Sequence, residues 1–104
     1  MPDPEVDGPC VVLRRDMSMS HADFHRIFPR VAGDTPRHLS GNVVSLTEFE
    51  GGTLRIELEP EGVRRIANLT LPRTILKFRF DGYAQSEIDA FMRRFERSFR
   101  RGGG

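Results

Sequence analysis

Three histidines and a single cysteine are the side chains of this chain that could bind a transition metal. His21 and His25 are four residues apart, so both would project from one face of a helix, and His38 or Cys10 would have to complete a zinc site. The pair lacks the acidic partner of a His-Glu-x-x-His motif, and the chain has no second close pair of ligands. We therefore expect no metal and no other cofactor, with His21 and His25 as the only candidate metal ligands.

Four arginines gather near the C-terminal end of the sequence: Arg93, Arg97, Arg100 and Arg101. On a helix they would lie on or near one side, where guanidinium groups can follow the phosphates of a nucleic acid. Cations in the last turn of a helix also interact favourably with the helix dipole, and Glu96 lies among them. These arginines are therefore the candidate nucleic-acid or anion contacts, and an ordinary solvated helix face is the alternative.

The sequence shows no arrangement of nucleophile, base and acid that is typical of an enzyme. Cys10, several serines and three histidines are present, but nothing resembles a nucleophile elbow. Gly51-Gly52 is too short to cradle a nucleotide and precedes a strand rather than a helix. We expect a protein that is not an enzyme, and no motif assigns the chain to a family.

The length and composition indicate one small domain. The chain has 104 residues and a formal net charge of +1, and its single cysteine excludes an internal disulfide bond. Residues 1–9 are expected to be a disordered acidic, proline-containing tail, residues 10–101 one domain, and residues 102–104 a flexible glycine tail. A secretion signal and a membrane-spanning stretch are not recognisable, so we expect a cytoplasmic protein without membrane contact.

The first part of the domain is predicted to be a strand followed by a short helix. The strand begins at Cys10, where a short apolar run follows Pro9. Ser20 stands where a helix N-cap would be, and Asp23 completes a capping box three residues later. Because Pro29 lacks an amide hydrogen and restricts the residue before it, we expect the helix to end or bend there.

The middle of the chain alternates apolar and polar residues, a pattern typical of half-buried strands. Gly51-Gly52 separates two such runs and suits a tight hairpin turn, and Pro60-Glu61-Gly62 is expected to mark the next reversal. The stretch from Val63 to Phe80 is either one bent strand or two strands broken at Leu71-Pro72-Arg73; we favour two, since proline is excluded from central ladder positions.

The last helix, from about Ser86 to Arg101, has the clearest pattern in the sequence. Ser86 is the expected N-cap, acids occupy the first turn and arginines the last. One apolar stripe runs along this helix and should face the core; it consists of Ile88, Phe91, Met92, Phe95 and Phe99.

These elements predict a two-layer α+β sandwich, in the order β-α-β-β-β-β-α, with an antiparallel meander sheet and two helices on one face. Apolar residues left on the other face would form an interface, for which Val43 or Val44, Leu46, Ile66 and Ile75 are the candidates. We therefore expect a non-catalytic binding or assembly module that associates with itself through its sheet, or with another protein. The alternative is a nucleic-acid-binding accessory protein that uses the arginine-rich helix and tail.

Overall fold

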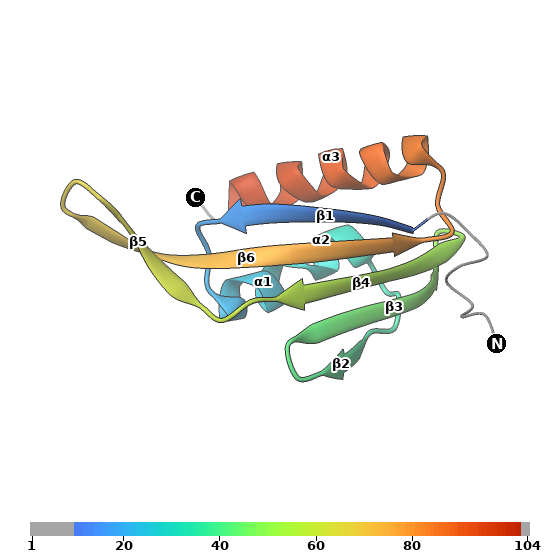
Figure 1. Cartoon of the computed structure of the whole chain (residues 1–104), viewed down its shortest axis with the longest axis horizontal. Helices are drawn as coiled ribbons and strands as arrows, with labels where there is room; N and C mark the ends of the chain where they lie inside the picture. Colours follow the sequence, from blue (N-terminus) through green and yellow to red (C-terminus); the bar gives the residue numbers. More distant parts are fainter. Residues whose placement is uncertain (1–9, 103–104) are drawn as a thin grey trace.

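The computed structural model describes residues 10–102, with only the backbone of Arg101 and Gly102. The tail predicted for residues 1–9 and the last two glycines lie outside the described residues, whereas Gly102 belongs to the last helix. In chain order the elements are β1 (Cys10–Met17), α1 (His21–Ile27), α2 (Pro29–Ala32), β2 (His38–Ser40), β3 (Val43–Phe49), β4 (Gly52–Leu58), β5 (Gly62–Ile66), β6 (Leu69–Asp81) and α3 (Gln85–Gly102). The strands pair antiparallel in the order β1-β6-β4-β3-β2, and β5 pairs with one end of β6 (Figure 1).

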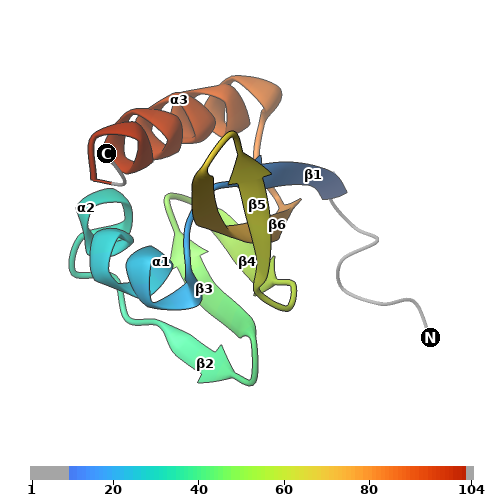
Figure 2. The same cartoon turned by 90° about the vertical axis from the view of Figure 1, so that its left-hand side faces the viewer.

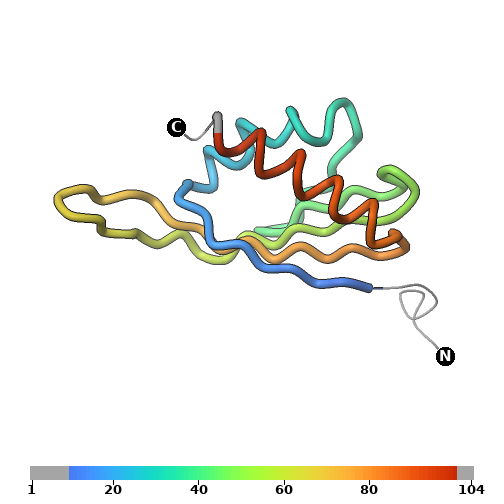
Figure 3. Tube along the Cα trace, turned by 90° about the horizontal axis from the view of Figure 1, so that it is seen from above, coloured from blue at the N-terminus to red at the C-terminus, as the bar shows by residue number. Residues whose placement is uncertain are grey.

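The helices all lie on one side of the sheet, so the molecule has two layers (Figure 3). The inward residues of the strands and the apolar sides of the helices form one buried core. This arrangement confirms the predicted α+β sandwich with an antiparallel sheet and helices on one face, and it leaves the other face of the sheet uncovered.

The stripe predicted on α3 is buried and forms the aromatic centre of the core. The Phe95 ring stacks on Phe99 with 4.2 Å between ring centroids and meets the edge of Phe78 at 4.9 Å. Such aromatic pairs add to the stabilisation that burial of their area already gives. Every phenylalanine and the single tyrosine of the chain are buried, so no phenyl or phenol ring is left at the surface to stack on a ligand.

The N-cap predicted for α3 is wrong, because the helix begins at Gln85 rather than after Ser86. The Ala84 amide donates a 2.7 Å hydrogen bond to Glu87 Oε1, and the Glu87 amide donates to the Ala84 carbonyl at 3.0 Å. A first-turn glutamate therefore satisfies the start of the helix, and the serine lies inside it.

The capping box predicted for the first helix is confirmed. The Asp23 amide donates to Ser20 Oγ at 3.0 Å, the Ser20 amide donates back to Asp23 Oδ2 at 3.3 Å, and the hydrogen bond from the Ser20 backbone lowers the pKa of Asp23. Pro29 interrupts the helix as expected, but the chain continues helically, because proline fits the first position of α2. The first helix is thus two short segments that end at Gly33, whose φ is +63°.

The course of the chain from β4 to β6 differs from the prediction. β4 and β5 both run antiparallel to β6, so Pro60-Glu61-Gly62 interrupts one continuing direction and is not a reversal. The reversal lies at Ala67-Asn68, and Pro72 stays within β6. Proline is tolerated there because, within the described chain, this end of β6 pairs only with β5 and its other edge lies outside the ladder. We call residues 62–73 the arm; it projects from the body at the end nearest the viewer in Figure 2.

The turn between β3 and β4 lies next to the start of α3. Its central residues Glu50 and Gly51 have φ of 51° and 92°, the left-handed conformation that a two-residue hairpin requires. Tyr83 is buried beside this turn, and its hydroxyl donates a 2.5 Å hydrogen bond to the Phe49 carbonyl. The hydroxyl therefore joins the β3–β4 hairpin to the segment that leads into α3.

Tyr83→Phe is expected to lower the free energy of unfolding by about 0.5–1.5 kcal/mol near neutral pH, because the Phe49 carbonyl loses its donor. Burial, and then the charges of Glu50 and Glu87, raise the pKa of Tyr83 to about 12. The folded protein therefore holds this proton more tightly than the unfolded chain, in which the phenol titrates near pH 10. The stability that this bound proton contributes is fully present below pH 10 and is lost as the pH rises toward 12.

Urea unfolding of wild type and Tyr83→Phe across this pH range measures the effect. The difference in unfolding free energy between the two proteins should shrink above pH 10, since only wild type carries the phenol. A difference that stays constant up to pH 12 would show that the Tyr83 hydroxyl is not held in its protonated form by the fold.

Candidate functional site

The uncovered face of the sheet is built from the outward residues of its five paired strands. Cross-strand register places these residues in rows: Ser45, Arg55, Arg79 and Val12 form one row, and Val43, Glu57, Lys77 and Arg14 form the next. The alternation of apolar and polar residues within each strand explains this, because the intervening residues are buried beneath the helices. The face is therefore largely polar and charged.

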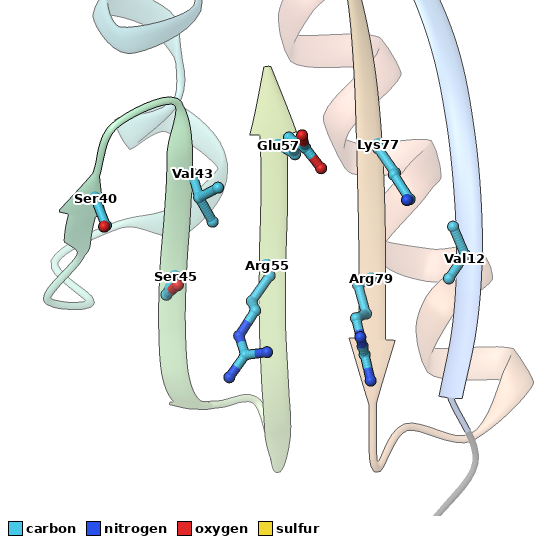
Figure 4. A pocket seen from close by; sticks show the side chains of 8 residues that line it. All are labelled: Val12, Ser40, Val43, Ser45, Arg55, Glu57, Lys77 and Arg79. Carbon is cyan, nitrogen blue, oxygen red and sulfur yellow. The ribbon is translucent and has the colours of Figure 1, made fainter. Parts of the chain in front are cut away.

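A hollow of about 430 Å³ lies on this face, with side chains from all five strands around it (Figure 4). Arg55 on β4 lies directly opposite Arg79 on β6 in the register, and both guanidinium groups point toward the same end of the strands. Like charges in directly opposed positions of a sheet destabilise it unless other groups compensate them. This end of the hollow is the strongest candidate site on the described surface.

The two arginines differ in how their charge is compensated. Arg79 Nε lies 3.3 Å from Asp81 Oδ2 on its own strand. Arg55 is exposed, and within the described part of the chain its guanidinium has no hydrogen bond or ion pair. An exposed planar guanidinium without a partner can bind a phosphate or carboxylate through two parallel hydrogen bonds.

The other end of the hollow carries both signs of charge. Glu57 and Lys77 are cross-strand neighbours, and Ser40 lies next to Val43 on the β2–β3 side. Ser45, on the same side, belongs to the row of Arg55 and Arg79. The hollow therefore has a basic end formed by Arg55 and Arg79 and a mixed end that can orient a ligand by hydrogen bonds. Nothing in this set resembles a nucleophile with an adjacent base.

The apolar surface expected on this face is only partly there. Val44 and Leu46 are buried on the helix side, and Ile66 lies on the arm, 51% exposed. Val43 and Ile75 are half-buried on the uncovered face. The face thus lacks the continuous apolar patch on which an expected sheet-mediated dimer would depend.

The arginines predicted on the last helix lie on the side of α3 that faces away from the sheet. Arg93, Arg97 and Arg100 are exposed, and among the described side chains none of them forms an ion pair or hydrogen bond. The side chain of Arg101 lies outside the described residues. Glu96 bonds to Arg15 at 3.0 Å, so the acid that lies among these arginines in the sequence is directed elsewhere.

The two histidines of α1 have separate surroundings. His21 Nε2 lies 2.8 Å from the Glu59 carbonyl, whereas His25 contacts the ring of Phe24 edge to face. Burial, followed by the charges of His21 and Arg37, lowers the pKa of His25. Across residues 10–102, no three His, Cys, Asp or Glu side chains lie close enough together to hold a metal ion.

Sequence reasoning did not single out Arg55. The alternation around Leu54, Ile56 and Leu58 puts residue 55 on the outer face, so its exposure was foreseeable. Its position opposite Arg79 depends on a register that pairs residues 24 apart in the sequence, which alternation alone does not give.

Comparison of the chain with protein-family models, with curated proteins and with solved structures found no match. Within the described residues, no helix is both long enough and apolar enough to cross a membrane.

Proposed function

We propose that this protein is a small non-catalytic binding module that takes a partner bearing phosphate or carboxylate groups on its uncovered sheet face. The observation that carries the proposal is the Arg55–Arg79 pair at the basic end of a hollow that no helix covers. Because Cys10 is a free thiol, we propose that the protein is located in the reducing cytoplasm.

An anion bound to Arg55 would compensate the one guanidinium of this pair that has no partner within the described chain, while Arg79, which pairs with Asp81, lies directly opposite it. Hydrogen bonds from charged donors contribute roughly 1.5–3 kcal/mol each. The adjacent serine hydroxyls supply neutral donors, which add orientation without adding charge.

The same charges disfavour face-to-face self-association through the hollow. A two-fold axis near its basic end would place Arg55 and Arg79 of one copy against the same residues of the other. Opposed like charges at an interface cost several kcal/mol. We therefore assign the uncovered face to an anionic partner rather than to a second copy.

A nucleic acid bound along α3 is the second candidate. Arg93, Arg97 and Arg100 follow one another at helical spacing and are exposed without acidic partners among the described side chains. This stripe lies on the opposite layer from the hollow, so one rigid ligand of modest size cannot contact both surfaces. Variants in the two surfaces should therefore have separable effects.

Arg55→Ala is expected to weaken binding of an anionic probe about ten- to a hundredfold, the equivalent of losing one charge-assisted contact. The probes are inorganic tripolyphosphate, poly-glutamate, and short single-stranded and duplex oligonucleotides, each measured at low and physiological salt by calorimetry or fluorescence anisotropy. Arg30→Ala is the matched control, because Arg30 is also exposed but lies on α2.

Equal affinity of Arg55→Ala and Arg30→Ala for every probe would contradict the proposed site. If binding is lost only when Arg93, Arg97 and Arg100 are replaced together, the helix stripe is the contact and the second candidate takes precedence. Loss in both sets of variants, with little dependence on the probe, would indicate general attraction to polyanions.

A further inference from the structure

The arm carries most of the exposed large apolar side chains of the described chain. Val63 is 61% exposed, Ile66 51% and Leu69 61%, and the other two such residues, Val12 and Leu39, lie elsewhere. In the described chain the arm is two-stranded, and neither of its edges joins a further strand. Isolated two-stranded hairpins are at best marginally stable in water, and apolar side chains that gather on one projecting element are typical of interaction sites.

The base of the arm is fixed to the body by one carboxylate. Asp16 on β1 accepts hydrogen bonds from Arg73 at 2.8–3.1 Å and a further bond from Arg64, and Arg64 also donates to Ser18 Oγ at 2.9 Å. The hydrogen bond from Arg73, followed by the charge of Arg64, lowers the pKa of Asp16. Two arginines from the two strands of the arm thus meet on one acid, which holds the arm in a defined direction.

An apolar groove of about 420 Å³ lies beside this base; we call it the end groove. Its apolar lining is Met17, Met19, Ile27 and Phe99, contributed by the end of β1, by α1 and by the end of α3. Ser18 belongs both to the groove and to the contacts of Arg64, so the groove and the base of the arm adjoin. The elements that line the groove, which are the end of β1, α1 and the end of α3, lie toward the end of the molecule from which the arm projects (Figure 1).

We propose that the protein forms a two-fold symmetric dimer in which the arm of each copy lies in the end groove of the other. When an element projects from the same end of a molecule as a groove that fits it, one two-fold axis across that end lets each copy place its element in the groove of the other. Five residue pairs give the arm a length of about 17 Å, enough to cross the end of a second copy. In such a dimer the same contact is made twice.

Charge supports a second copy as the occupant of the groove. Arg65 is exposed on the arm, and within the described residues its guanidinium has no partner. Glu96 lies in the wall of the end groove and uses Oε2 to accept from Arg15, while its Oε1 has no hydrogen bond within the described chain. Arg100 also lines the groove and has no partner among the described side chains, so an arm that enters the groove must bring Arg65 to the unused oxygen of Glu96 on the side away from Arg100.

The central test is the oligomeric state of the full chain, measured by sedimentation equilibrium across a wide range of concentrations. Wild type is expected to dimerise, and the double variant Ile66→Ser, Leu69→Ser should dimerise at least about a hundredfold more weakly, because each buried side chain of this size contributes a factor of ten or more. Leu39→Ser is the matched control, since Leu39 is 59% exposed but lies on β2. It should leave dimerisation unchanged.

A charge exchange tests the groove independently of any loss of apolar surface. Arg65→Glu and Glu96→Arg should each weaken the dimer, and the variant carrying both should recover it, since the pair is restored between copies in reverse. Circular dichroism confirms that each variant is folded, and Arg55→Ala should dimerise as wild type does, which separates this proposal from the sheet-face site.

A wild-type protein that stays monomeric at the highest concentrations would overturn the proposal, as would a dimer that the arm and groove variants leave unchanged. Binding of the monomer to duplex oligonucleotides that depends on Arg65, Ile66 and Leu69 would also overturn it, since the arm would then be a nucleic-acid contact.

Discussion

Phe95→Ala is expected to lower the free energy of unfolding by about 3–5 kcal/mol, the largest effect of any single change considered for this protein. Phe95 is fully buried, and its ring packs against Phe99, Phe78 and Phe91 with centroids 4.2, 4.9 and 6.2 Å away. The substitution removes most of this contact and leaves a cavity between α3 and β6. Because small domains are stable by only about 5–15 kcal/mol, the variant should be close to unfolding at ambient temperature.

Urea or thermal unfolding followed by circular dichroism measures this loss, with Arg97→Ala as the control on the same helix. Arg97 is exposed and has no partner among the described side chains, so its replacement should change stability by no more than about 0.5 kcal/mol. A loss below about 1 kcal/mol for Phe95→Ala would mean that α3 is not the principal anchor of the core.

Gly52→Ala is expected to destabilise the protein by about 1–3 kcal/mol, through overpacking rather than through a cavity. A methyl group at this position would lie 2.6 Å from the Asp81 carbonyl oxygen and 2.8 Å from two ring atoms of Tyr83. Neither neighbour is the free end of a flexible chain, since one is backbone and the other is a buried ring. The substitution should therefore also disturb the hydrogen bond between Tyr83 and Phe49.

Gly62→Ala is the control for this variant. No atom lies within 4 Å of the added methyl group, and the backbone there does not adopt the left-handed conformation. Replacing such a glycine slightly favours the folded state by restricting the unfolded chain. Equal stability of the two alanine variants would show that the close approach of Gly52 to β6 and Tyr83 is not a requirement of the fold.

The sequence predicted well those features that depend on near neighbours. The apolar stripe of α3 recurs at helical spacing, and Ser20 and Asp23 are three residues apart, so local chemistry determined both. The start of α3 was placed two residues too late because serine is the better N-cap in isolation. In the folded chain Glu87 supplies the capping contact to Ala84 instead.

The path from β4 to β6 could not be predicted in the same way. A Pro-Glu-Gly sequence is typical of a reversal, and Pro72 is typical of a strand break. Both expectations were wrong because β6 is 13 residues long and pairs with different partners along its length. Which residues of β6 lie in the centre of the sheet and which in the arm depends on contacts between distant segments.

The candidate site shows the same division. The exposure of Arg93, Arg97 and Arg100 followed from helical periodicity and is found in the structure. The meeting of Arg55 with Arg79 required β4 and β6 to be aligned, and the meeting of Arg64 with Arg73 on Asp16 required β1, β5 and β6. A surface formed within one helix can thus be predicted from the sequence, whereas a surface formed across a sheet can be predicted only when the register of its strands is known.

The buried side chain of Tyr83 is an intrinsic fluorescence probe of the fold. The chain has no tryptophan and one tyrosine, so its fluorescence excited near the tyrosine band comes from a single site. That ring lies against Phe80 and is hydrogen-bonded to the β3–β4 hairpin. A change in its emission therefore reports separation of this hairpin from the segment before α3, and unfolding can be followed at one defined place without a label.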